Sequence, residues 1–173
     1  MENWKDWSPW VMSKVTRYCP NVKEILEIGG RGRELGNFVL GKNFRTLNYP
    51  KEDICKQTSF PAEKFELIYS SSTFEHLYDP FFAAKEIVRI LKLGGIAIII
   101  TVWAWRYHPG LDFDDYWRFS VPGLKLLFSE LKILESGYDL SDRRKDCRLN
   151  NIPVDQLGGW REHWYVYLIG QKC

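Results

Sequence analysis

The feature that most constrains the fold is a short apolar segment that runs directly into a cluster of glycines. Val22 to Ile28 has the composition of a buried strand, and Gly29, Gly30 and Gly32 follow it at once. Glycines at such a point allow a sharp turn and a close approach of a ligand to the backbone. A helix expected over Glu34 to Leu40 would present unpaired N–H groups and a positive dipole end. The segment therefore predicts an α/β fold that can bind a carboxylate or phosphate beside its first strand.

Strands and helices alternate along most of the remaining chain. The β-branched run Ile96 to Val102 is typical of a strand buried on both faces of a parallel sheet. Such alternation predicts a mainly parallel sheet covered on both faces, and two final strands with no helix between them predict an antiparallel pair at one edge. Further strands are expected over 44–49, 65–70, 132–138 and 163–169, and helices over 8–18, 80–91 (ended by Gly94-Gly95) and 121–131.

The bulk composition excludes several classes of protein. The length of 173 residues fits one domain, 1–173, with residues 1–20 as an N-terminal helical segment or lid. A net charge of +2 argues against a nucleic-acid binder, and nothing in it points to a membrane surface. No signal peptide is visible, and the longest apolar run, Ile96 to Trp105, is too short to cross a bilayer. We therefore expect a cytoplasmic protein, while the oligomeric state stays open.

The cysteines and histidines give no metal-binding pattern. Cys19, Cys55, Cys147 and Cys173 lie far apart without a C-x-x-C pair, and the three histidines are scattered. Reduced thiols and no metal site are therefore expected.

The glycine loop also has to be compared with the dinucleotide-binding fingerprint. Gly30, Gly32 and Gly36 form GxGxxxG, which differs from GxGxxG, and Asn48 stands where the fingerprint places a ribose-binding acid. An NAD(P)-dependent oxidoreductase and a tight turn without a ligand remain as alternatives at this point.

Four segments in a fixed order resemble the class I S-adenosylmethionine (SAM)-dependent methyltransferases. They are Ile25 to Gly29, Phe65 to Ser70 followed by Phe74-Glu75-His76-Leu77, Glu86 to Gly95, and Tyr107-His108-Pro109 with Asp115-Tyr116-Trp117-Arg118-Phe119. The resemblance covers nearly the whole chain. It implies a Rossmann-like three-layer sandwich with a seven-stranded, mainly parallel sheet and an antiparallel last strand, and SAM across the carboxyl ends of the strands.

The resemblance also assigns residues to the cofactor. Glu27 would help to hold the methionine ammonium, and Asn48 would face the ribose. Two departures stand out: Arg31 and Arg33 replace later glycines of the family loop, and Asn48 replaces an acid. The other implied positions are Gly29, Gly30 and Gly32 beside the methionine and ribose, Asp53 and Ile54 at the adenine, and Ser70 near the methionine end.

Because SAM carries an activated methyl group, the protein needs mainly to align an acceptor and remove its proton. His76 and His108 are candidate bases, with structural hydrogen bonding as the alternative for each. Asp115 and Arg118 either orient an acceptor or pair with each other, and Tyr116 either lines the acceptor site or packs in the core. The predicted activity is methyl transfer to oxygen or nitrogen of a small molecule or a glycan-containing metabolite. The alternative is an inactive methyltransferase-like partner or regulatory subunit.

Overall fold

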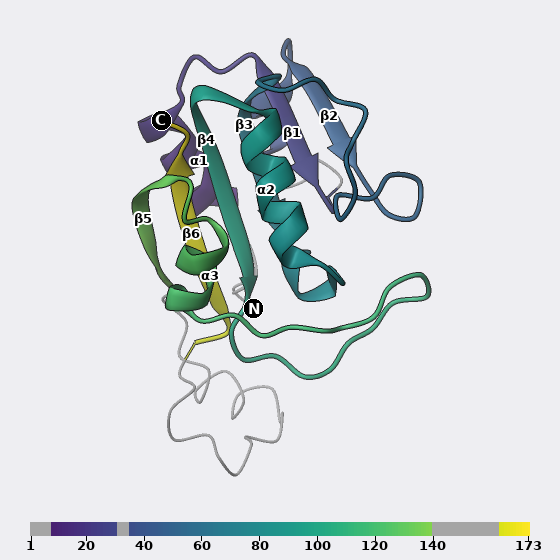
Figure 1. Cartoon of the computed structure of the whole chain (residues 1–173). Coiled ribbons are helices and arrows are strands. Elements are labelled where there is room, and N and C mark those ends of the chain that lie inside the picture. The colour runs from purple at the N-terminus through teal and green to yellow at the C-terminus, as the bar shows by residue number, and fades with distance from the viewer. Residues whose placement is uncertain (1–7, 31–34, 140–162) are drawn as a thin grey trace.

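A computed structural model describes residues 8–30, 35–139 and 163–173. These residues form one six-stranded sheet in the order β2-β1-β3-β4-β6-β5, covered on both faces by helices (Figure 1). The strands are β1 (Glu24–Ile28), β2 (Asn43–Leu47), β3 (Phe65–Ser71), β4 (Leu91–Val102), β5 (Lys132–Tyr138) and β6 (Tyr165–Gln171). The helices are α1 (Ser8–Tyr18), α2 (Pro80–Ile90) and α3 (Val121–Leu127), with short 3₁₀ turns η1 (Gly36–Val39) and η2 (Phe74–His76).

The strand directions confirm the mainly parallel sheet with an antiparallel last strand. β1 pairs in parallel with β2 and β3, and β3 pairs in parallel with β4. β6 runs antiparallel to β4 and to the edge strand β5. The prediction of seven strands was wrong for the described residues, which form six. The chain between β2 and β3, residues 48–64, forms a series of turns and adds no strand.

The core has two layers, one on each face of the sheet, as expected for a three-layer sandwich (Figure 1). One layer packs α2 and α3 against the sheet and includes Ile87, Ile99 and Phe128. The other packs α1 against the opposite face and includes Val15 and Ile98. Successive residues of β4 thus enter opposite layers, which explains why its sequence is almost continuously apolar.

The largest differences from the predicted boundaries concern α2, the segment after the glycine turn and α3. α2 ends at Ile90, before the glycines, because Leu91 already pairs with Phe65 and the N–H of Gly94 donates to the carbonyl of Lys172 at 2.8 Å. The helix expected over 34–40 is only a 3₁₀ turn, η1, within the described residues. The helix expected over 121–131 ends at Leu127, where the chain turns into β5.

Helix α1 is fastened to the antiparallel edge of the sheet. Lys14 Nζ lies 2.6 Å from Oε1 of Glu135 on β5, and the Tyr18 hydroxyl donates to the other oxygen at 3.1 Å. The Trp10 ring meets the Tyr167 ring edge-on with 4.6 Å between centroids. Trp10 therefore packs against the sheet, while Trp4, Trp7 and residues 141–161 lie outside the described residues.

Two further expectations concern the membrane and the thiols. None of the described helices is long and apolar enough to cross a membrane. Cys19, Cys55 and Cys173 are free thiols, and Cys147 lies outside the described residues.

Candidate active site

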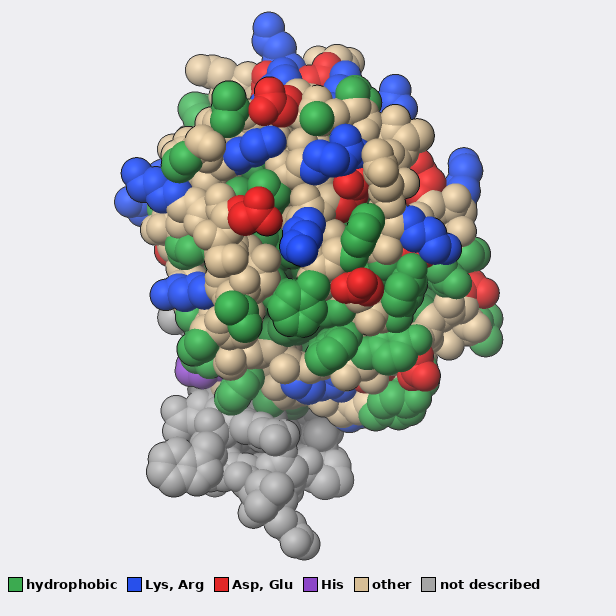
Figure 2. Space-filling view, in the orientation of Figure 1, with side chains coloured by type: hydrophobic (Ala, Val, Ile, Leu, Met, Phe, Trp, Pro, Cys, Tyr) green, Lys and Arg blue, Asp and Glu red, His purple; other side chains and the backbone are tan. Residues whose placement is uncertain are grey.

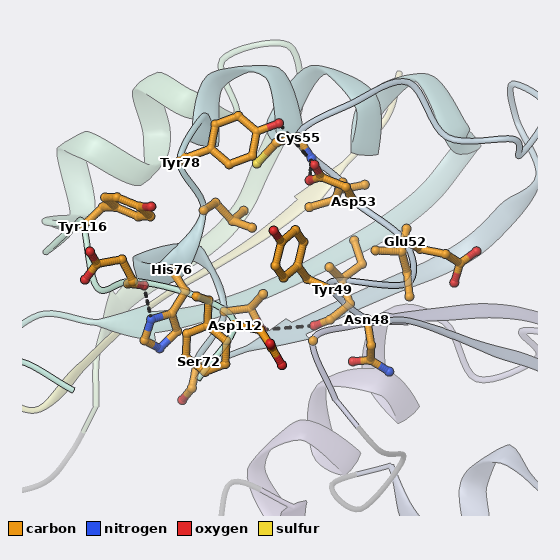
Figure 3. A pocket seen from close by; sticks show the side chains of 18 residues that line it. Asn48, Tyr49, Glu52, Asp53, Cys55, Ser72, His76, Tyr78, Asp112 and Tyr116 are labelled. Carbon is orange, nitrogen blue, oxygen red and sulfur yellow. Dashed lines mark hydrogen bonds between the residues drawn. The ribbon is translucent and has the colours of Figure 1, made fainter. Parts of the chain in front are cut away.

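A cavity of about 420 Å³ lies where β1, β2 and β3 end at their carboxyl ends. Its walls come from three stretches that follow these strands and from residues 112–114 and 116, which belong to the long connection between β4 and α3. Figure 3 shows Asn48, Glu52 and Asp53 on one side of the cavity and His76 and Tyr116 on the other. The cavity therefore has two chemically distinct ends.

The glycine turn at the end of β1 is held tightly against the segment that follows β3. Gly29 has a φ of +79°, and a Cβ there would lie 2.0 Å from Oγ1 of Thr73. The Thr73 hydroxyl lies 3.2 Å from the carbonyl oxygen of Ile28 and 3.0 Å from that of Ser71, so it can donate to either. Because Thr73 is held in this way, only glycine fits at position 29 without a shift of the chain.

Polar side chains after β2 line the same end of the cavity. The Asn48 side-chain amide donates to the carbonyl of Gly30 at 3.2 Å, which leaves its oxygen available as an acceptor. Oδ1 of Asp53 accepts the N–H of Cys55 at 2.9 Å, and Oδ2 accepts the Tyr78 hydroxyl at 3.1 Å. These bonds fix the Asp53 carboxylate at the cavity wall.

At the opposite end, the 3₁₀ turn η2 brings a buried carboxylate beside two histidines. The Glu75 side chain is fully buried, and burial raises its pKa above the ordinary value, although a hydrogen bond from Thr101 opposes the shift. Its Oε1 lies 3.9 Å from Nε2 of His76 and 3.9 Å from Nε2 of His108. The two imidazole rings meet edge-on, 4.8 Å apart between centroids.

The connection between β4 and α3 is fixed to this turn by its own backbone. The N–H groups of Tyr116 and Trp117 donate to the carbonyl of Glu75 at 2.8 and 3.1 Å. Asp115 pairs with Arg118 through two hydrogen bonds and accepts the N–H of His108 at 2.8 Å. Burial opposes ionisation of Asp115, but the Arg118 guanidinium and the His108 N–H outweigh it and lower its pKa to about 2.

Comparison with known proteins identifies the family of this chain. Residues 14–99, about half of the chain, match the model of a methyltransferase domain family. The chain belongs to the class I SAM-dependent methyltransferases. A comparison with curated protein sequences gives no match. The family match removes the basis for the oxidoreductase interpretation.

Solved structures agree with the methyltransferase fold at low sequence identity. A chain of the complex between the Haloferax volcanii Trm112 methyltransferase activator and a methyltransferase is 17% identical, with a TM-score of 0.63 over 96% of this chain and 89% of that one. Geranyl diphosphate C-methyltransferase from Streptomyces coelicolor A3(2) is 12% identical, with a TM-score of 0.63 over 96% and 76%. Phosphoethanolamine N-methyltransferase 2 of Haemonchus contortus, solved with SAM, is 13% identical, with a TM-score of 0.61 over 95% and 52%.

The cofactor of this methyltransferase is SAM, and the chemistry of the cavity fits it. Four carboxylates line the cavity, and no Lys or Arg stands among the described residues that do so. A negative lining favours a ligand with a sulfonium and an ammonium group. The acidic residues are Glu52, Asp53, Asp112 and Asp114.

The structure brings some of the predicted site residues to the cavity and leaves others behind its wall. The wall includes Gly29, Asn48, Asp53, Ile54, His76 and Tyr116. Glu27 is buried beneath the glycine turn, where a Cβ on Gly30 would meet its Oε1 at 2.1 Å, and Ser70 is buried with its hydroxyl donating to the carbonyl of Ile28. His108, Asp115 and Arg118 stand behind the wall, and Gly32 lies outside the described residues.

Glu75 stands out among the site residues that the sequence did not predict, because its carboxylate lies beside both candidate bases. It was noted only as part of a family segment, and no role was assigned to it. A carboxylate directly before a candidate base was a usable signal, but its burial depends on Thr101 and on the distant segment 115–118.

Proposed function

We propose that this methyltransferase transfers the methyl group of SAM to an oxygen or nitrogen atom of a small, non-anionic acceptor, such as an amine or a sugar hydroxyl. The observation that carries the proposal is the division of one cavity between a polar end after β1 and β2 and an end built from His76 and residues 112–114 and 116. Two ligands can meet in such a cavity with their reacting atoms side by side.

The end after β1 and β2 is assigned to the cofactor. SAM supplies a methyl group on a positively charged sulfur, ready for transfer to a nucleophile. We assign Asn48 to the ribose hydroxyls, because its amide oxygen remains free to accept. We assign Asp53 to the adenine amino group and Ile54 to the ring, because both lie on this wall. The backbone at Gly29 allows the close approach that the methionine portion needs.

The opposite end is assigned to the acceptor. His76 lies on the cavity wall, and His108 lies directly behind it. Either Nε2 can take the proton of an acceptor hydroxyl or ammonium as methyl transfer proceeds, directly or through one water molecule. Tyr116 and Phe113 flank this end and can pack against the apolar part of an acceptor.

The charge of the lining selects the chemical class of acceptor. Asp112 and Asp114 belong to the connection that forms the acceptor end, where Nδ1 of His76 lies 2.8 Å from the carbonyl oxygen of Asp114. Glu52 and Asp53 line the cofactor end, where Lys56 Nζ lies 3.2 Å from Oδ2 of Asp53. A phosphate or carboxylate group would be repelled there, whereas an amine would be attracted and a hydroxyl tolerated. The same reasoning argues against the phosphate backbone of a nucleic acid as acceptor.

The test is a methyl-transfer assay with isotopically labelled SAM and a panel of amines, polyols and sugars, each paired with its phosphorylated counterpart. Transfer to the neutral or cationic member of a pair is expected. His76→Ala should leave SAM affinity nearly unchanged and lower turnover by roughly 10²- to 10⁴-fold.

His163→Ala is the matched control, because His163 stacks on Tyr138 and does not line the cavity. Transfer only to phosphorylated acceptors would contradict the charge argument. SAM binding without transfer to any acceptor, in the panel or in cell extract, would favour the inactive-partner alternative.

A further inference from the structure

In the cluster of Glu75, His76 and His108, contacts at the Nδ1 atoms fix the tautomer of both imidazole rings. Nδ1 of His76 lies 2.8 Å from the carbonyl oxygen of Asp114. Nδ1 of His108 lies 2.9 Å from the carbonyl oxygen of Arg106 and 3.0 Å from Oδ2 of Asp115. Carbonyl and carboxylate oxygens only accept hydrogen bonds, so each Nδ1 carries the ring proton. In neutral imidazole, Nε2 of both rings therefore presents a lone pair.

Both Nε2 atoms lie near the same carboxylate oxygen. Oε2 of Glu75 accepts the Thr101 hydroxyl at 2.6 Å, but no described residue donates a hydrogen bond to Oε1. This oxygen is fully buried and lies 3.9 Å from each Nε2. A buried polar atom without a partner costs roughly 1–3 kcal/mol. Three acceptor atoms thus surround one point with no donor among them.

A cation at that point would satisfy all three atoms at once. A proton could bridge only one pair of them, and the third would stay unsatisfied. The three ligand atoms lie within 4.8 Å of one another. Metal–ligand distances near 2.1 Å in a tetrahedral site place ligand atoms about 3.4 Å apart, so Oε1 of Glu75 would need to approach each Nε2 by about 0.5 Å, and the widest pair of ligand atoms would need to close by up to about 1.4 Å.

The side chains of the cluster are oriented by further hydrogen bonds, as the ligands of a metal ion usually are. Metal-binding histidines usually donate their second ring N–H to a carboxylate or a backbone carbonyl, which fixes the tautomer and the ring orientation. Asp115 and the carbonyl of Asp114 supply these acceptors here, and Arg118 in turn holds Asp115. The Thr101 hydroxyl orients the Glu75 carboxylate in the same way.

We propose that Glu75, His76 and His108 bind one divalent transition-metal ion at the acceptor end of the cavity. Two imidazoles and one carboxylate are a known ligand set for Zn²⁺ and Fe²⁺, whereas Mg²⁺ and Ca²⁺ prefer oxygen ligands. The three ligands lie 33 residues apart at most, in two segments that only the fold brings together, so the sequence spacing gives no metal signal.

The place of the ion gives it a role in methyl transfer, and this part rests on the proposed function. His76 lines the cavity, so an ion on its Nε2 would stand at the wall where the acceptor binds. A hydroxyl coordinated there would release its proton to water in the cavity more readily, and its oxygen would then be a better nucleophile toward the methyl group. With the ion bound, both Nε2 atoms are occupied, and the histidines act as ligands and not as bases.

The direct test is metal binding by the full chain, without any methyl acceptor. Chelator-treated protein is titrated with Zn²⁺, Co²⁺ and Mg²⁺ by calorimetry, and retained metal is counted after gel filtration. One Zn²⁺ per chain, a higher melting temperature by mass action, and visible absorption from Co²⁺ are expected, with no response to Mg²⁺. Glu75→Gln and His108→Ala should each weaken Zn²⁺ binding by at least about 100-fold. Replacing a residue that only hydrogen-bonds to a ligand already weakens metal binding by up to about 100-fold, and loss of a ligand should cost no less.

Two control variants carry the same kinds of side chain outside the cluster. His163→Ala and Glu130→Gln, the latter at an exposed position that does not line the cavity, should bind Zn²⁺ like the unmodified chain. SAM binding measured on every variant reports whether the fold and the cofactor end are intact. If Glu75→Gln does not fold, His108→Ala and His76→Ala decide the question. Absence of retained Zn²⁺, or equal retention by the cluster variants, would overturn the metal site while leaving the methyltransferase proposal standing.

Discussion

The Thr101 hydroxyl and the Glu75 carboxylate form a buried hydrogen bond of 2.6 Å that joins the end of β4 to the turn η2. We expect Thr101→Val to remove the only described side-chain donor to that carboxylate and to destabilise the protein by roughly 1–3 kcal/mol. Denaturant unfolding measures the change. Thr46→Val, on the exposed side of β2, should change stability little.

The same variant separates stability from the proposed metal site. If Thr101 orients Glu75 as a ligand, Thr101→Val should weaken Zn²⁺ binding about 10- to 100-fold while SAM binding is kept. An unchanged Zn²⁺ affinity would mean that the hydrogen bond serves the fold alone.

Gly29 gives a second prediction, because it combines a positive φ with a close contact to Thr73. Gly29→Ala should abolish SAM binding and destabilise the protein, since its Cβ would lie 2.0 Å from a hydroxyl that is held in place. Gly41→Ala is the matched control, with a φ of +72° and open space around its Cβ. It should cost only about 1 kcal/mol of backbone strain and leave SAM affinity unchanged, as calorimetry would check.

Much of the fold could be predicted because it depends on local patterns. The strand β1 before its glycines and the part of β4 from Ile96 to Val102 follow from apolar runs in the sequence, and both runs lie within observed strands, although β4 begins earlier, at Leu91. The end of α2 could not be predicted from Gly94 and Gly95. It depends on the pairing of Leu91 with Phe65 and on the contact with Lys172, residues distant in the chain.

The site was predictable in part for the same reason. Asn48 and Asp53 follow a strand closely, so their place at its carboxyl end follows from the order of the elements. Whether a polar residue faces the cavity depends on contacts from elsewhere. Asp115 looks like an acceptor-binding residue in sequence, but Arg118 and His108 occupy its oxygens. Glu75 is buried because Thr101 and the segment 115–118 lie against it.

Glu86 on α2 gives a prediction about pH. It is buried, which opposes its ionisation, but hydrogen bonds from Arg89 and Thr58 hold its pKa below the ordinary value of 4.5. A lowered pKa in the folded state adds stability above pH 4.5, and this is lost as pH falls through the lower folded value. Glu86→Gln should therefore be less stable than the unmodified chain by roughly 1–3 kcal/mol at neutral pH, with the gap shrinking in acid.

Thermal unfolding of both proteins across a series from acid to neutral pH measures this difference in stability. Glu130→Gln, at an exposed position, should be as stable as the unmodified chain at every pH. If Glu86→Gln lost the same amount of stability at every pH, packing of the side chain and not its charge would matter at this position.

Asn48 tests the assignment of the cofactor end. Its amide donates to the carbonyl of Gly30 at 3.2 Å and leaves the side-chain oxygen facing the cavity that we assign to the ribose. Asn48→Leu removes both groups and should weaken SAM binding by roughly 1–3 kcal/mol. Asn48→Asp keeps the acceptor oxygen and adds charge, which strengthens a hydrogen bond from a hydroxyl, so SAM binding should be kept or tightened. Calorimetric titration with S-adenosylhomocysteine compares the three proteins, and equal affinities would mean that position 48 does not touch the cofactor.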